Sequence, residues 1–176
     1  MTPNKTMLSL LAKHSVTLTE PIPEDSSYPI WRKTDTAGRA YWGVSSFCGL
    51  DRHPIKAGQE LSYLEWDGNE VYLSADTNAQ TAQILRQAIG ILKFWRKEVE
   101  TKYPETAFYL FASYDNGDLL EAEGGESPTR SIALRFWADR GNDKVICLDG
   151  FDDRAQPLLF EYCPSVKASA KSEKKR

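Results

Sequence analysis

Residues 77–102, TNAQTAQILRQAIGILKFWRKEVETK, decide the fold because their apolar side chains recur at helical spacing. On a helix these side chains fall within about 100° of arc. The members of this stripe are Ile84, Ala88, Ile91, Leu92, Trp95 and Val99. Asp76 or Thr77 can cap the start of the helix, and Pro104 ends it. A long amphipathic helix over about 77–102 needs an apolar surface to pack on, and the flanking segments predict a sheet.

Strand-like segments lie on both sides of this helix. They are rich in aromatic and β-branched residues, which favour a pleated surface. The predicted strands are Arg39–Ser46, Leu61–Trp66, Glu70–Leu73, Ala107–Tyr114, Arg130–Trp137, Lys144–Leu148 and Pro157–Cys163. Asp67-Gly68-Asn69 predicts a hairpin turn between the second and third of them.

Short polar turns between successive strands favour antiparallel pairing. The sequence therefore predicts an α+β fold, in which a meander-like antiparallel sheet of about six to seven strands packs on the long helix. A second, short helix is expected over residues 5–13, where Met7, Leu8, Leu10 and Leu11 lie.

The formal charge of −3 divides unevenly along the 176 residues. Residues 165–176 hold five of the 22 basic residues but one of the 25 acidic ones, so this tail carries +4 and residues 1–164 carry −7. A length of this size predicts one domain. We expect a single α+β domain over 1–164 and a disordered basic tail over 165–176.

Cysteine usage and hydropathy predict a cytoplasmic protein. No segment approaches the roughly 18 consecutive apolar residues of a membrane span, and no secretory signal is apparent. The three cysteines, Cys48, Cys147 and Cys163, are odd in number and widely spaced. They fit neither a disulfide framework nor a zinc site. We expect no metal and no cofactor.

Cys48, Asp51 and His53 lie within six residues and suggest a cysteine nucleophile with a nearby base. Catalytic Cys/His pairs are normally assembled from distant parts of a chain, and ordinary loop residues are the alternative interpretation. No phosphate-binding loop, nucleophile elbow or zinc-protease motif occurs. A cysteine-dependent enzyme at Cys48 and His53 is the third hypothesis for function, and the first is not enzymatic.

Clusters of acidic residues are the more distinctive signal. Residues 60–76 and 115–126 each hold five acidic residues and no basic one, and Asp149, Asp152 and Asp153 form a third group. If these turns lie on one edge of the sheet, they create a field that attracts a basic partner. Trp42 and Trp137 are expected to add an exposed aromatic patch. The predicted contact residues are Glu65, Asp67, Glu70, Asp115, Asp118, Glu121, Glu123, Asp152, Asp153, Trp42 and Trp137.

These features predict a non-enzymatic inhibitor or immunity-type protein that neutralises a basic bacterial toxin or nuclease. A phage-encoded inhibitor of a host defence nuclease would have the same properties. The alternative is a nucleic-acid-associated module, which would use the tail and the basic side of the helix (Arg86, Lys93, Lys97 and Arg96). Acidic turns that only keep the chain soluble are a further interpretation.

Overall fold

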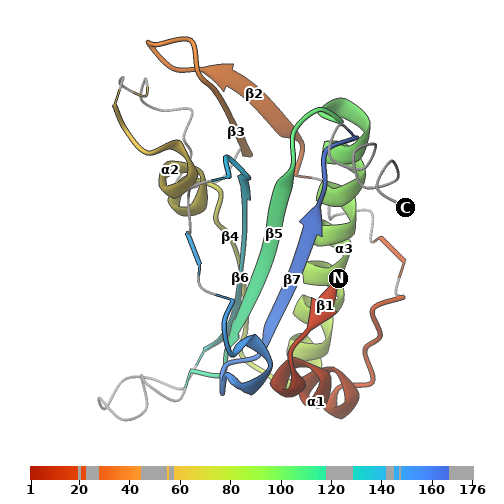
Figure 1. The fold of residues 1–176 in the computed structure, drawn as a ribbon. Helices are drawn as coiled ribbons and strands as arrows, with labels where there is room; N and C mark the ends of the chain where they lie inside the picture. The colour runs from red at the N-terminus through yellow and green to blue at the C-terminus, as the bar shows by residue number, and fades with distance from the viewer. Residues whose placement is uncertain are drawn as a thin grey trace, which may run out of the picture.

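The structure is a computed structural model, and it describes residues 1–19, 21–22, 28–44, 55, 58–117, 129–141, 145–146 and 148–166. A sheet and one long helix form its two main layers (Figure 1). The elements in chain order are β1 (Thr2–Pro3), α1 (Lys5–Lys13), β2 (Ile30–Thr34), β3 (Ala40–Val44), α2 (Leu61–Gly68), β4 (Val71–Ala75), α3 (Asn78–Lys102), β5 (Phe108–Asp115), β6 (Arg130–Ala138), the 3-10 helix η1 (Phe151–Asp153) and β7 (Leu158–Cys163).

All strand pairs among the described residues are antiparallel, which confirms the predicted fold class. The larger sheet has the order β1-β7-β5-β6-β4, and β2 and β3 form a separate two-stranded sheet. β5 and β6 pair as chain neighbours, whereas β7 returns to the other side of β5 and β4 pairs with β6. The sheet order therefore departs from the chain order, and β4 becomes an edge strand.

The long helix is where the sequence predicts it. Thr77 is the N-cap of α3, and its hydroxyl accepts a hydrogen bond from the backbone N–H of Gln80. Gln80 Oε1 in turn accepts from the backbone N–H of Thr77, which completes a capping box. The predicted N-terminal helix is also confirmed, with Asn4 as its N-cap.

The segment from Leu61 to Gly68 is a helix, so the predicted strand and its Asp-Gly hairpin turn are wrong. The physical reason is burial: Leu61, Ser62 and Glu65 are fully or almost fully covered, and they lie within about one helical turn of one another. A strand would have turned alternate residues to opposite faces. The short β1 and β2 were not predicted, and the described residues of the expected strand 144–148 are not in a strand.

The core lies between α3 and one face of the larger sheet. Trp95 of α3 is fully buried and packs edge-on against Phe136 of β6 at a centroid distance of 5.1 Å. Its indole N–H donates to the backbone carbonyl of Tyr28 at 3.0 Å, so the segment before β2 covers the other side of the helix. Because α3 is buried from two sides, its placement organises both sheets.

Loss of the α3 cap should lower stability. Replacing Thr77 with Ala removes the side-chain acceptor for Gln80, and we expect the free energy of unfolding to fall by about 1 kcal/mol. Urea denaturation followed by circular dichroism measures the change. Thr77→Ser keeps the hydroxyl and is the matched control; an equal loss in both variants would contradict this role of the cap.

Candidate functional site

The predicted acidic residues that the structure describes form two groups, one on and beside α2 and one where β5 ends and β6 begins (Figure 1 shows these elements). Asp67 and Glu70 are at the α2 end, before β4 begins. Asp115 ends β5, where it pairs with Ser131 at the start of β6. Asp152 and Asp153 belong to η1, near the start of β7, and therefore share the Asp115 end. The described acidic residues do not form one continuous surface, and Asp118, Glu121 and Glu123 lie outside the described residues.

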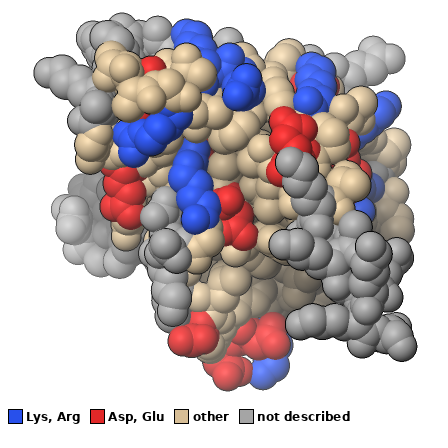
Figure 2. Space-filling model, turned by 45° about the horizontal axis from the view of Figure 1, so that its top comes forward, with Lys and Arg blue, Asp and Glu red and all other residues tan. Residues whose placement is uncertain are grey.

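Acidic and basic side chains are also unevenly distributed over the face that Figure 2 shows. In Figure 2 several red side chains gather at the lower tip, whereas most of the blue ones lie in the upper half. At the η1 end, Asp153 is already partnered, because Lys5 Nζ lies 2.7 Å from its carboxylate. Electrostatic attraction of a partner must therefore be argued separately for each end.

The two tryptophans expected on the surface are buried, so that expectation is wrong. Trp42 is 6% exposed and packs edge-on against Phe108 at 5.2 Å. Trp137 is 3% exposed, stacks on Tyr109 and meets Trp66 of α2 edge-on. The position of α2 explains Trp137, because a helix now covers the part of the sheet that the predicted hairpin would have left open.

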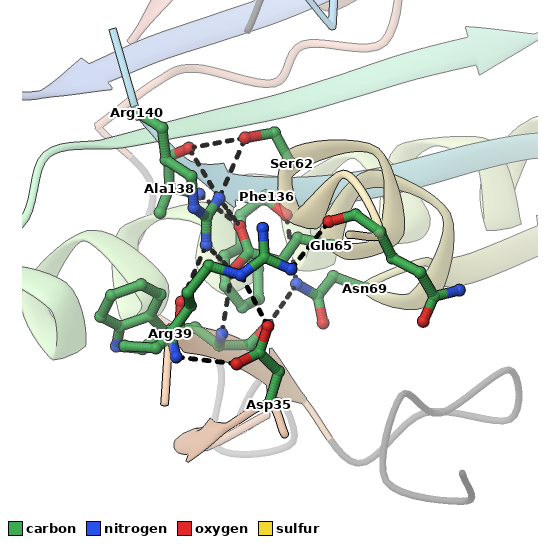
Figure 3. A network of polar contacts seen from close by, with 11 residues as sticks. Asp35, Arg39, Ser62, Glu65, Asn69, Phe136, Ala138 and Arg140 are labelled. Carbon is green, nitrogen blue, oxygen red and sulfur yellow. Dashed lines mark hydrogen bonds and ion pairs between the residues drawn. The ribbon is translucent and has the colours of Figure 1, made fainter. Parts of the chain in front are cut away.

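Glu65 is fully buried and forms a structural ion pair (Figure 3). Arg140 approaches it with both terminal nitrogens: Nη2 lies 2.7 Å from Oε1 and Nη1 lies 2.9 Å from Oε2. The same carboxylate accepts the backbone N–H groups of Trp42 at 3.0 Å and Ala138 at 2.8 Å. With both oxygens occupied and no exposure, Glu65 is not available to a partner, contrary to the prediction.

Asn69 extends this network one helical turn further along α2. Its amide oxygen accepts from the backbone N–H of Val44, and its amide nitrogen donates to the carbonyls of Trp42 and Phe136. Glu65 and Asn69 are four residues apart and therefore project from the same side of the chain. Together they link β3 to β6 through side chains where the two sheets share no main-chain ladder.

Opposing effects act on the pKa of Glu65. Burial raises the pKa, because desolvation penalises the charged carboxylate, while Arg140 and the N–H groups of Ala138 and Trp42 lower it. The net direction is upward. A signal for this network was present in the sequence: Ser62, Glu65 and Asn69 recur at spacings of three and four among apolar residues, which is a helical pattern.

The turn of the β2–β3 hairpin is held by Asp35. Its Oδ1 accepts the backbone N–H groups of Ala37 and Arg39, and its Oδ2 pairs with Arg39 Nε at 2.7 Å. Arg39 also donates to the carbonyl of Gln59, just before α2. Although burial raises the pKa of Asp35, these hydrogen bonds lower it overall. The hairpin is thus tied to α2 at its turn as well as along β3.

An exposed surface lies on the outer side of this network, and we call it the α2–β4 patch: Tyr63, Asp67, Glu70 and Tyr72. Tyr63 and Asp67 are exposed and one helical turn apart, on the side of α2 opposite Glu65. Tyr72, on the edge strand β4, is 59% exposed. Two of the predicted contact residues, Asp67 and Glu70, belong to this patch.

Arg135 of β6 connects the parts of the α2–β4 patch. It forms an ion pair with Glu70, and its guanidinium lies 4.8 Å from the ring centroid of Trp66. Burial lowers the pKa of Arg135, and the charge of Asp67 opposes this shift, so Asp67 lies within electrostatic reach of the same guanidinium. Glu70 is therefore partly neutralised, whereas Asp67 is an exposed carboxylate.

The basic side of α3 is largely engaged within the molecule. Arg96 lies 2.8 Å from both Glu100 and Glu161. Arg86 and Lys93 are half-buried, and each has an interaction with another residue. Lys97 is exposed. Such pairing reduces the charge that this helix can offer to nucleic-acid phosphates.

The three residues of the cysteine hypothesis, Cys48, Asp51 and His53, lie outside the described residues. Within the described ranges, no group of three or more His, Cys, Asp or Glu residues is arranged to hold a metal ion. No described helix is long and apolar enough to cross a membrane. No family model, curated protein or solved structure matches the chain.

The buried ion pair yields a stability prediction. Arg140→Met leaves the Glu65 carboxylate buried without its partner, and we expect the free energy of unfolding to fall by about 3 kcal/mol or more. The Glu65 pKa rises further without the guanidinium, so the native state holds a proton that the unfolded state releases, and stability falls as pH rises through that interval. Urea denaturation should therefore show a larger deficit near neutral pH than in mildly acidic buffer.

The double variant Glu65→Gln/Arg140→Met is the control for this experiment, and it also serves if the single variant does not fold. It leaves no buried charge, so it should be more stable than Arg140→Met and its deficit should lose the pH dependence. A single variant as stable as the unsubstituted protein would show that the pair does not hold α2 in place.

Cys163 gives a second prediction. This thiol is 2% exposed on β7, and burial, followed by the charges of Glu161 and Glu100, raises its pKa from 9.0 to about 12. Such a shift reduces the thiolate fraction by about a thousandfold. In a chain with Cys48 and Cys147 replaced by Ser, iodoacetamide should label Cys163 slowly in buffer and rapidly in urea. Equal rates in both would contradict the burial.

Proposed function

We propose that this chain is a non-enzymatic binding protein of the inhibitor or immunity type, and that its α2–β4 patch contacts a basic protein partner such as a toxin or nuclease. One observation carries the proposal: Tyr72 and Tyr63 are 59% and 47% exposed, more than any other aromatic side chain in the described ranges. Both lie in the acid-rich segment 60–76, which has no basic residue.

Exposed tyrosines are well suited to protein contacts. A tyrosine offers a large apolar area and a hydroxyl, and it loses little conformational entropy when it is immobilised. Tyrosine is also enriched among the few residues that dominate binding energy. The Glu65–Arg140 pair and Asn69 hold α2 in place, and the ladder with β6 holds β4. A partner would therefore bind a surface that loses little conformational entropy on binding.

The charge of the patch favours a basic partner. Of the five carboxylates in segment 60–76, Glu65 is neutralised by Arg140 and Glu70 is paired with Arg135. Glu60, Asp67 and Asp76 are exposed. Exposed carboxylates around an aromatic centre attract a cationic surface at a distance and raise the association rate, particularly at low salt.

The edge position of β4 leaves the patch accessible from the side of the sheet. A partner could cover Tyr72 without displacing another strand. The proposal places the protein in the cytoplasm, in keeping with the free thiol of Cys163.

Affinity capture followed by reconstitution tests the proposal. The immobilised full chain and the variant Tyr63→Ser/Asp67→Asn/Tyr72→Ser are incubated with lysate of the source cell, and retained proteins are identified and purified. We expect a basic protein that the full chain retains and whose affinity for the variant is at least about tenfold weaker, since lost tyrosine anchors cost more than 1 kcal/mol each. Adding the chain should abolish the activity of that protein.

Two control variants remove similar groups elsewhere. Tyr162→Ser removes a tyrosine that is 42% exposed on β7, and Asp149→Asn removes an exposed carboxylate near η1. Both should bind the partner as the unsubstituted chain does. Equal weakening in the controls, or a purified partner that is acidic or keeps its full activity in the complex, would overturn the proposal.

A further inference from the structure

A cleft of ≈ 820 Å³ lies where β5 ends and β6 begins, and none of the residues of the α2–β4 patch lines it. Its walls come from α1, the end of β5, the start of β6, the first residue of α3 and residues 155–157. We propose that this cleft binds a phosphate-bearing small molecule. The proposal is independent of the protein-binding function, because the cleft and the α2–β4 patch share no residue.

The charges around the cleft are predominantly positive. Lys13 of α1, the C-cap residue His14 and Arg130 of β6 line it, and Asp115 at the end of β5 is the one acidic residue among its lining residues. In the part of the chain that the structure describes, neither Lys13 nor Arg130 makes an ion pair. Two cations that face the same cleft provide attraction for an anion.

The positive charge around the cleft also affects the pKa of His14. Burial lowers its pKa, and the positive charges of Lys13 and Arg130 lower it further. The imidazole is therefore discouraged from taking a proton while the cleft is empty of anions. A bound dianion would offset the two cations and raise the pKa of His14.

The first turn of α3 adds to the attraction. Asn78, the first residue of this 25-residue helix, lines the cleft. The positive end of the helix dipole therefore lies at the cleft, where it favours a bound negative charge. This effect reinforces the charges of Lys13 and Arg130, which are the primary argument.

The remaining lining residues indicate the kind of anion. The guanidinium of Arg130 offers a planar set of donors that matches a phosphate, and Lys13 supplies a point charge. Leu10 and Pro157 provide apolar wall, and Thr6 and Ser9 provide hydroxyls. A cleft of this size accommodates a small organic molecule in addition to its phosphate group.

Nuclear magnetic resonance of His14 tests the inference. The chain has two histidines, so the full-length His53→Gln variant leaves His14 as the only imidazole. Its ring resonances are followed during titrations with inorganic phosphate and with ATP at constant ionic strength. We expect saturable shifts and a higher pKa of His14 with either compound, and tighter binding of ATP if the organic part also contacts the cleft.

Substitutions locate the site. Arg130→Gln should weaken phosphate or ATP binding at least about tenfold, since a hydrogen bond to a charged group contributes about 1.5–3 kcal/mol. Lys97→Gln, which removes an exposed cation near the other end of α3, should leave binding unchanged. Circular dichroism confirms that both variants fold.

Three outcomes would overturn the inference. One is the absence of a saturable shift at millimolar phosphate and ATP. Another is equal binding by Arg130→Gln and the unsubstituted chain. The third is the same shift with citrate at equal ionic strength, because that would show a general response to anions and no preference for phosphate.

Discussion

The pairing of Glu65 with Arg140 is the interaction on which the arrangement of this molecule depends. A buried carboxylate is costly unless a cation and hydrogen-bond donors surround it, and here two backbone N–H groups and both terminal nitrogens of one guanidinium do so. Those backbone groups belong to β3 and β6, and the carboxylate belongs to α2. One side chain therefore positions a helix and two strands from different sheets, and Asn69 repeats the arrangement a turn later.

This constraint determines what α2 exposes. With Glu65 directed inward, Tyr63 and Asp67 must lie on the outer side of the helix, and Trp66 covers Phe111 and Trp137 of the sheet. The most exposed aromatic residues among those described are tyrosines on α2 and β4, where the sequence had suggested tryptophans on the strands. The acidic, tyrosine-containing patch and the cationic cleft consist of different residues, so substitutions can test each of them separately.

Much of the fold could be predicted because its signals are local. The long run of helical periodicity in α3, the cap at Thr77 and the short apolar run of α1 each act within a few residues of chain, and all appear in the structure as expected. The prediction of a strand and a hairpin turn for residues 61–69 is wrong because Asp67-Gly68-Asn69 is also a strong local turn signal. Its actual conformation depends on Arg140, some 75 residues away in the chain, whose charge makes a buried Glu65 tolerable.

The sequence by itself determined that the chain is α+β with antiparallel strands, that its longest helix spans 77–102, and that its acidic residues gather in three segments. These properties follow from side-chain order and composition, which need no knowledge of distant neighbours. Only the tertiary structure decided which carboxylates are buried, paired or exposed, which aromatic residues reach the surface, and that Lys13, His14 and Arg130 face one cleft. Such properties depend on groups brought together from distant parts of the chain. Glu65 is an example, because its burial beside Arg140 makes an acidic side chain part of the internal structure rather than of the surface.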